Sequence, residues 1–371
     1  MALSQHQQLY EVIQKSSNPL ITFRQDHNGD IIGGSLALAE LLSKMGRNAE
    51  IVSPNFVLPA SYNYLTKANS IKDRVENLKK IIISVDVEHN KHPEIDYKIE
   101  NNRLHIFVHP QNSNLRKENF QIADNHFKHD LIITLNTPDL ETLGDLYTEN
   151  TDFFYQTPII NIDHTPDNEH YGHINLINLT ATSISEIIYD FIEQIDTNLF
   201  DENIATSLLT GMIEKTKSFK LSTVTPKSLN IASHLVSLGA NRDLIIKNLY
   251  QHQTVNALRL WGRVLLNLQT DSQQKIAWAV LTENDFSATN STPEDLIGSI
   301  EELISSIPTV EITALFYEKG ITKHTLIKAE KQLDLSFEFA NFKPTGYKNL
   351  IRFQFDEDHN RILDKLKTLT Y

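Results

Sequence analysis

The sequence contains no cysteine, little glycine and proline, and no long apolar run. Without cysteine, the chain has no disulfide bonds, no thiolate zinc site and no cysteine nucleophile. Because 371 residues include only 12 glycines and 12 prolines, collagen-like and disordered classes are excluded. Apolar runs such as Ile81–Ile83 are far shorter than the roughly 18 residues of a membrane span. Residues 1–16 lack the apolar core of a signal peptide, so we expect a cytoplasmic protein without membrane contact.

Basic residues are also scarce relative to acidic ones. The chain has 34 Lys and Arg against 47 Asp and Glu, a formal net charge of −13. A surface this acidic is unsuited to gripping long nucleic acid, which needs many phosphate contacts. A short or nucleotide-sized anion in a local pocket remains compatible with the charge. An apolar share of 40% is normal for a globular protein, and the length suggests two or three domains.

The first half of the chain alternates short β-branched runs with helical patterns, which predicts an α/β domain with a mostly parallel sheet. A helix is expected to begin near Ser35 and to stop at Gly46. The expected strands are residues 20–23, 49–52, 80–85, 103–108, 130–135 and 158–162.

Helical patterns then dominate to residue 268, and strand patterns return near residue 276. We therefore predict a first α/β domain at 1–222, a helical connector at 223–269 and a smaller α/β domain at 270–371. A cleft between the two α/β lobes is expected. A helix is predicted over residues 293–305.

Two strand-to-loop segments carry the residues suited to chemistry. In Asn161–Asn175, a buried strand delivers Asp163 and His164 to the carboxyl edge of the sheet, where ligands bind in such folds. In Asn28–Leu38, Asp30 is expected in a loop. Gly33 and Gly34 would there let the backbone approach a phosphate at the start of the next helix.

These segments resemble the DHH/DHHA1 phosphoesterase family, whose strand ends carry His-x-x-x-Asp-x-Asp, a lone Asp, Asp-His-His and Asp-Thr-Gly patterns. The resemblance covers nearly the whole chain, and residues 333–349 match the stretch of the family's C-terminal domain that ends in a Gly-Gly-Gly-His loop. It implies a two-lobed fold, two manganese ions and hydrolysis of short oligonucleotides, cyclic dinucleotides, bisphosphonucleosides or polyphosphates.

The departures from the family patterns fall at the implied metal ligands. The degenerate positions are Arg24, Asn28, Asn136, Thr165 and Lys215, and the Gly of the last pattern is Lys217. Only Asp30, Asp163 and His164 survive. In the C-terminal domain the Gly-rich loop is reduced to Gly346 between Pro344-Thr345 and Tyr347.

So few ligands cannot hold two divalent ions, because Asn is a weak donor and Arg or Lys cannot ligate at neutral pH. We therefore expect no cofactor. The charges of Arg24 and Lys215 can instead balance Asp30 and Asp163. The residues expected to bind an anion are Arg24, Gly33, Gly34, Ser35, Lys215 and Gly346.

Two alternatives stay open for the surviving residues. Asp163 can cap loop amides and His164 can be a packed imidazole, so that both only maintain the fold. A shifted single-ion site would use Asp26, His27, Asp30 and His164. Four further histidines lie in a hairpin-like insertion at residues 88–110, where their spacing fits no compact metal site.

The favoured function is a non-catalytic module that binds a nucleotide, a short oligonucleotide or a protein partner. One alternative is a residual metal-dependent phosphoesterase acting on the family's substrates. Another is a structural partner of an active relative. A homodimer, or a heterodimer with such a relative, is a further expectation.

Overall fold

The structure, a computed structural model, divides the chain into two compact units. It describes residues 4–25, 28–86, 94–109, 116–250, 254–300, 307, 309–320, 322–329, 333–347, 349–356 and 358–370. Unit 1 spans Met1–Leu249 and unit 2 spans Tyr250–Tyr371. Each unit buries its own apolar core. Among the described helices, none combines the length and the apolar character needed to cross a membrane.

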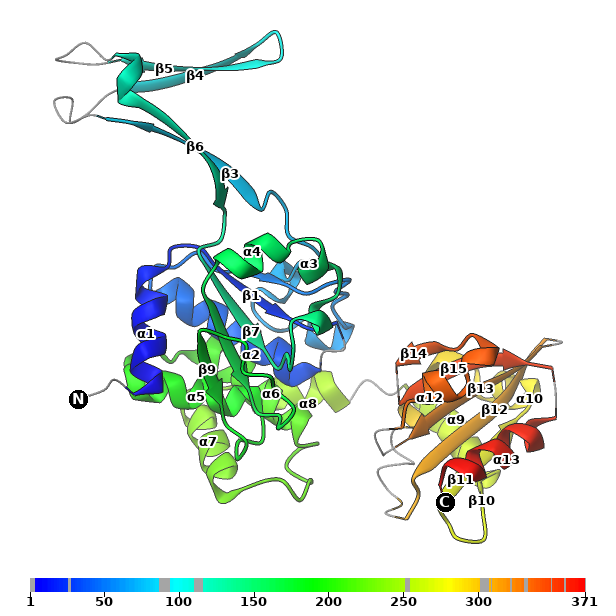
Figure 1. Cartoon of the computed structure of the whole chain (residues 1–371). Helices are drawn as coiled ribbons and strands as arrows, with labels where there is room; N and C mark the ends of the chain where they lie inside the picture. The colour runs from blue at the N-terminus through cyan, green and yellow to red at the C-terminus, as the bar shows by residue number, and fades with distance from the viewer. Residues whose placement is uncertain are drawn as a thin grey trace. The chain divides into compact units, whose positions relative to one another are not determined.

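Unit 1 is built on a five-stranded sheet whose neighbouring strands all run parallel, in the order β2-β1-β7-β8-β9 (Figure 1). The strands are β1 (Pro19–Phe23), β2 (Glu50–Val52), β7 (Leu131–Leu135), β8 (Ile159–Asp163) and β9 (Ile174–Ile177). Every residue of β1, β7 and β8 is buried, which explains their continuous apolar runs. The predicted α/β class and parallel sheet are confirmed.

Helices pack against this sheet or against one another. They are α1 (Gln5–Lys15), α2 (Gly29–Lys44), α3 (Asp145–Thr148), α4 (Thr151–Gln156), α5 (Ile184–Ile195), α6 (Glu202–Lys215), α7 (Pro226–Ser237) and α8 (Arg242–Tyr250). Helices α2, α5 and α6 pack on one another. Gly33 of α2 permits this approach, since a Cβ there would lie 2.3 Å from the backbone oxygen of Ser207 on α6.

The expected helix start near Ser35 is wrong. Helix α2 begins at Gly29, and the Oδ1 of its N-cap Asn28 accepts the backbone N–H of Ile31 at 3.2 Å. Close packing against α5 and α6 stabilises the first turns of α2, although Gly33 and Gly34 have low helix propensity. The predicted end is confirmed, since Gly46 has a φ of +73° just after the helix.

The residues between β2 and β7 include an insertion of two separate antiparallel ribbons. One pairs β3 (Lys79–Val85) with β6 (Phe120–Phe127), and the other pairs β4 (Glu94–Glu100) with β5 (Arg103–His109). The strand expected at 80–85 therefore exists but does not belong to the parallel sheet. The hairpin expected near residues 88–110 is confirmed for the described part of that segment.

Unit 2 contains a six-stranded mixed sheet in the order β10-β11-β12-β13-β15-β14, in which only β11 and β12 pair in parallel. The strands are β10 (Gln269–Thr270), β11 (Ile276–Leu281), β12 (Ile312–Lys319), β13 (Thr322–Ala329), β14 (Thr345–Tyr347) and β15 (Leu350–Phe355). Its helices include α9 (Val255–Leu266), α10 (Glu283–Thr289), α12 (Leu335–Glu338) and α13 (His359–Leu369). A smaller C-terminal α/β lobe is thus present.

The helix expected over 293–305 opens with a 3₁₀ turn, Pro293–Asp295, and continues as α-helix through residue 300. Its last residues lie outside the described part of the chain. The residues of the expected connector are divided between the units, with α7 in unit 1 and α9 in unit 2. The domain limits and the cleft between the lobes stay predictions.

Candidate functional site

Three neighbouring strands end together at the carboxyl edge of the parallel sheet. β1, β7 and β8 lie side by side, so the residues that follow them, Arg24, Asn136 and His164, share that edge. The backbone N–H of Asn136 continues the ladder by donating to the carbonyl of Ile162 at 2.9 Å. The edge to which the sequence assigns Asp163 and His164 therefore also carries Arg24 and Asn136.

The Asp30 carboxylate is fully buried and already engaged. Its Oδ2 accepts the backbone N–H of Ile184 at 2.7 Å, and its Oδ1 accepts the backbone N–H of Ser185 at 3.0 Å and the Ser185 hydroxyl at 2.7 Å. Ile184 and Ser185 open helix α5, so Asp30 provides a negative charge at the helix N-terminus. Asp30 lies inside the first turn of α2, whereas the sequence predicted a loop position.

Asp163 is engaged in a similar way at the end of β8. Its Oδ1 accepts the backbone N–H of His164 at 2.6 Å and the backbone N–H and hydroxyl of Thr165 at 3.0 and 2.9 Å. Its Oδ2 accepts the Asn168 side-chain amide at 2.7 Å. Asp163 thus caps the loop that follows β8, which is the structural alternative that the sequence left open. Thr165, which stands at one of the degenerate ligand positions, donates two of these hydrogen bonds to Asp163.

An asparagine network that sequence reasoning missed fixes the same loop. The Asn161 amide of β8 donates to Oδ1 of Asn168 at 2.7 Å and to Oδ1 of Asn175 at 3.1 Å. Asn168 also donates to the carbonyl of Thr137 beyond β7, at 3.2 Å. The only signal in the sequence was the density of Asn within the segment 161–175.

His164 experiences charges from several elements. Burial lowers its pKa and the nearby charge of Lys215 lowers it further, while Asp30 and Asp163 act in the opposite direction. The Nε2 of His164 and the Oδ1 of Asn136 are buried and have no hydrogen-bond partner among the described residues. The structure therefore brings His164, Lys215 and both surviving Asp residues into one electrostatic cluster.

Glu214 was not singled out from the sequence, yet it belongs to this cluster. Burial, followed by the charge of Asp30, raises its pKa to about 7, while Lys215 and the backbone N–H groups of Asp30 and Gly29 partly offset the rise. Those N–H groups belong to the first turn of α2. Glu214 and Asn28 therefore occupy the donors of a helix start that would otherwise attract an anion.

Gly33, Gly34 and Ser35, expected to cradle a phosphate, lie inside α2 and are buried. Amides in a helix interior bond to the preceding turn, so the premise of a glycine-rich anion loop is wrong. A Cβ on Gly34 would lie 3.2 Å from Ile184 and Ile188 side chains of α5, which indicates a packing role.

The turn after α6 is strained. Lys217, Ser218 and Phe219 all have left-handed φ values, 48°, 59° and 63°. The family pattern has Gly at the position of Lys217, and a left-handed residue other than Gly costs roughly 1–2 kcal/mol. The Thr216 hydroxyl stabilises the turn by accepting the backbone N–H of Phe219 at 3.0 Å.

The donor set does not fit two manganese ions. Both surviving carboxylates accept hydrogen bonds on each oxygen, and Lys215 lies close enough to lower the pKa of His164. Across the described residues, no three His, Cys, Asp or Glu side chains form a metal-binding group. Asp26 and His27, needed for the shifted single-ion site, lie outside the described residues, so that alternative and the absence of a cofactor stay predictions.

In unit 2, Gly346 lies in strand β14 and not in a loop as the resemblance suggested. Its φ is +124°, and a Cβ would lie 2.3 Å from the carbonyl oxygen of Leu350 on β15. The pairing of β14 with β15 therefore explains why a glycine stands at position 346. Its expected role in anion binding stays a prediction.

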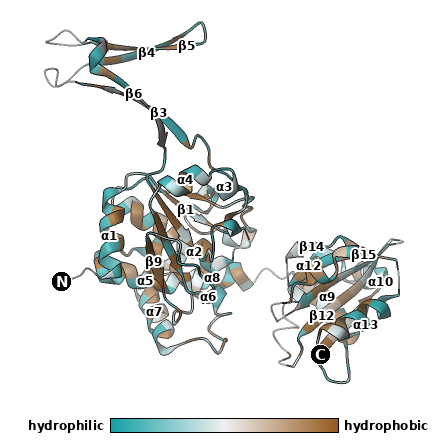
Figure 2. Ribbon diagram, viewed as in Figure 1, coloured by the Kyte–Doolittle hydropathy of each residue, from teal (hydrophilic) through white to brown (hydrophobic). Residues whose placement is uncertain are grey.

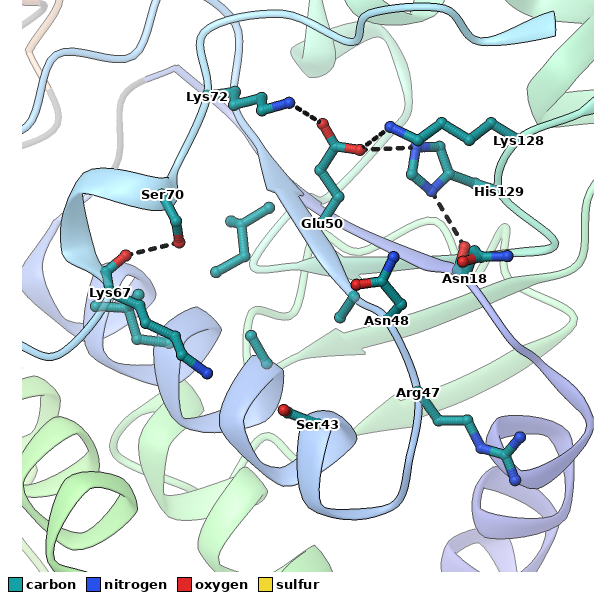
Figure 3. A pocket seen from close by; sticks show the side chains of 14 residues that line it. Asn18, Ser43, Arg47, Asn48, Glu50, Lys67, Ser70, Lys72, Lys128 and His129 are labelled. Carbon is teal, nitrogen blue, oxygen red and sulfur yellow. Dashed lines mark hydrogen bonds and ion pairs between the residues drawn. The ribbon is translucent and has the colours of Figure 1, made fainter. Parts of the chain in front are cut away.

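A polar pocket of about 320 Å³ lies at the opposite, amino edge of the parallel sheet (Figure 3). Its centre is Glu50, which forms ion pairs with Lys128 and with Lys72, the latter at 2.7 Å. The Nε2 of His129 lies 3.4 Å from the Glu50 carboxylate, but burial lowers the pKa of His129 and its Nδ1 bonds to the Asn18 carbonyl. Burial opposes ionisation of Glu50, but the two lysines outweigh it and lower its pKa. This cluster links the start of β2 to the segment before β7 and is separate from the candidate site.

Comparisons with known proteins identify relatives, although no family model matches the chain. It is 28% identical over 199 residues to a Streptococcus mutans protein described as a probable bifunctional oligoribonuclease and PAP phosphatase, NrnA. It is 27% identical over 212 residues to the Thermus thermophilus NrnA, a bifunctional oligoribonuclease and PAP phosphatase. These matches cover 54% and 56% of this chain and 61% and 64% of the relatives, less than two thirds of their length.

Among solved structures, the fold matches an exopolyphosphatase-related protein from Bacteroides fragilis. The TM-score is 0.68 at 17% identity, over 99% of this chain and 95% of the other. At that identity the likeness establishes the fold alone.

Proposed function

The chain is similar to the DHH/DHHA1 phosphoesterases in sequence and fold, and we propose that it binds a phosphate-bearing ligand, such as a nucleotide, without hydrolysing it. The observation that carries the proposal is that Asp30 and Asp163 are both engaged with the protein itself while the charge of Lys215 reaches His164. In such a site, the positive charge comes from side chains and not from metal ions.

The ligand chemistry follows from the polar and charged groups at the carboxyl edge. Lys215 contributes a positive charge, and His164 and Asn136 contribute buried polar atoms without a partner among the described residues. Buried polar groups cost free energy when unpaired, and the Asn136 Oδ1 can only accept a hydrogen bond. It therefore suits a ligand O–H or N–H group, such as a ribose hydroxyl or a base amino group, whereas Lys215 suits the phosphate. Arg24 adds a second cation at the same edge.

Titration calorimetry at low salt tests the binding. The ligands are AMP, a nucleoside 3′,5′-bisphosphate and a dinucleotide. We expect modest affinity that falls as salt rises, because charges at partly exposed sites are screened within about 8 Å at physiological ionic strength. Lys215→Ala should weaken binding about tenfold, the effect of one charge-assisted contact of about 1.4 kcal/mol. Lys220→Ala, an exposed lysine five residues further on, is the matched control and should have little effect.

A hydrolysis assay with manganese separates this proposal from residual catalysis, which the names of the NrnA relatives favour. Turnover abolished by both Asp30→Ala and His164→Ala, in variants that circular dichroism shows to be folded, would support the phosphoesterase alternative. Absence of binding by every nucleotide at low salt would support a structural role beside an active relative, and co-purification with that relative would be the next measurement.

A further inference from the structure

The β4–β5 hairpin has one apolar face and one face that is polar except for a single aromatic residue. The register pairs Ile95 with Val108, Tyr97 with Ile106 and Ile99 with Leu104, and directly paired residues point to the same side. The apolar face therefore consists of Ile95, Tyr97, Ile99, Leu104, Ile106 and Val108. The other face consists of Glu94, Asp96, Lys98, Glu100, Arg103, His105, Phe107 and His109, and it is polar except for Phe107, which is 45% exposed. Figure 2 shows both teal and brown along this ribbon.

The turn that connects β4 to β5 fixes the register of the two strands. Asn101 and Asn102 have left-handed φ values of 49° and 60°, the conformation of the two-residue type I′ turn that matches strand twist. A slip by one residue would move every apolar side chain to the polar face. The segregation is therefore a fixed property of the hairpin.

The apolar face is uncovered in the described part of the chain. The exposed fractions are 66% for Ile95, 75% for Tyr97, 71% for Ile99, 60% for Leu104 and 44% for Ile106. β4 and β5 pair only with each other and form a sheet of two strands. A two-stranded hairpin is marginally stable in water unless its apolar face packs against something.

We propose that a second copy of this chain covers this face, with two hairpins packed face to face. Two equal apolar faces are complementary under a two-fold axis, and stacked sheets lie about 10 Å apart. Side chains of this size expose on the order of 100 Å² each at these fractions, so the six from each of two copies bury on the order of 1,200 Å² when covered, the lower end for a specific interface.

Charge argues against a membrane as the occupant. Proteins that lie on membranes through an apolar face carry an excess of Lys and Arg beside it. Here the polar face mixes Glu94, Asp96 and Glu100 with Lys98 and Arg103, and the whole chain carries −13. The dimer surface lies in the insertion and is independent of the proposed ligand site.

Sedimentation velocity of the full chain, over a range of concentrations, tests the proposal with two neighbouring substitutions on β5. Ile106→Glu places a charge on the apolar face and should weaken dimerisation at least about tenfold, or 1.4 kcal/mol. His105→Glu makes the same charge change on the polar face and should leave the dissociation constant within about threefold. Circular dichroism should show the same core fold for both variants.

Cross-linking keeps the test informative if Ile106→Glu disrupts the hairpin itself. Because the chain contains no cysteine, a single Tyr97→Cys or Lys98→Cys gives one reactive thiol. A short bismaleimide should link two Tyr97→Cys chains efficiently and two Lys98→Cys chains poorly. Any of three results would overturn the proposal. The parent could be monomeric at all concentrations, the two Glu variants could have equal effects on dimerisation, or the two Cys variants could cross-link equally well. Flotation of a monomeric chain with anionic vesicles, lost in Ile106→Glu, would assign the face to lipid instead and would also overturn it.

Discussion

Ser185 donates two hydrogen bonds to Asp30, from its backbone N–H at 3.0 Å and from its hydroxyl at 2.7 Å, both to Oδ1. The two residues are 155 positions apart and join the start of α2 to the start of α5. An aspartate that the family resemblance assigns to a metal thus holds two helices of the protein together.

Asp30→Asn should destabilise the fold. The Asn amide would turn a donor toward one of the two N–H groups and leave it unsatisfied, so we expect a loss of about 2–4 kcal/mol. Ser185→Ala removes only the hydroxyl contact and should cost about 1 kcal/mol. Urea unfolding without added metal measures both. Equal stability of Asp30→Asn and the parent would refute the capping role.

Gly33→Ala should be destabilising because its Cβ would lie 2.3 Å from the backbone oxygen of Ser207. Separating α2 from α6 to relieve that contact should cost about 2 kcal/mol or more. Gly262→Ala in helix α9 is the control, since no atom lies within 4 Å of its added Cβ. There the higher helix propensity of Ala should stabilise by about 0.5–1 kcal/mol. Thermal unfolding distinguishes the two, and a stabilising Gly33→Ala would contradict the packing explanation.

Glu214 should make stability fall as pH rises toward 8. Its pKa rises from 4.5 to about 7 on folding, so its protonated form is favoured in the native state. The resulting stabilisation is complete below about 4.5 and is lost as pH rises through 7. Glu214→Gln should therefore be more stable than the parent at pH 8, by about 1–3 kcal/mol, and equal to it at pH 4. The exposed Glu11→Gln is the charge-matched control. A difference between parent and Glu214→Gln that does not change with pH would rule out this titration.

Glu50 should have the opposite pH dependence. Lys128 and Lys72 lower its pKa against the effect of burial, so its stabilisation is present above its unfolded pKa and is lost as pH falls through the folded one. Glu50→Gln should cost about 1–2 kcal/mol at pH 7, since the two lysines are partly exposed. Glu76→Gln, whose carboxylate lies 3.9 Å from Lys72 at the surface, should cost less than about 0.5 kcal/mol. Chemical unfolding at pH 7 and pH 3 checks both, and a Glu50→Gln loss that persists at pH 3 would exclude the ionic origin.

Manganese should bind weakly or not at all to the parent. Five substitutions together should restore metal binding more readily than hydrolysis, because Gly346 and its neighbours remain altered. The five substitutions are Arg24→His, Asn28→Asp, Asn136→Asp, Thr165→His and Lys215→Asp. Asp at position 28 can still cap α2 as Asn28 does. Titration calorimetry measures both proteins. A two-ion isotherm at micromolar affinity for the parent would contradict this expectation and point to Asp26 and His27.

The sequence by itself determined the local elements and the edge where the candidate site lies. Apolar runs at β1, β7 and β8 predict buried parallel strands, and the residues directly after them fall at one edge because parallel strands end together. Alternation in residues 103–108 predicts a half-exposed strand; the strand forms in the insertion, but six of the seven residues of β5 are exposed. These features are local, because the period of side-chain burial is set within each element.

Only the tertiary structure decided what the site residues do. Asp30, Gly33 and Glu214 lie where α2, α5 and α6 pack, and their partners come from distant parts of the chain. No periodicity in the sequence specifies which amide a buried carboxylate will cap, or which backbone atom will lie against a glycine. Those relations arise when helices approach within contact distance, since a buried carboxylate must then find donors and a Cβ must find space.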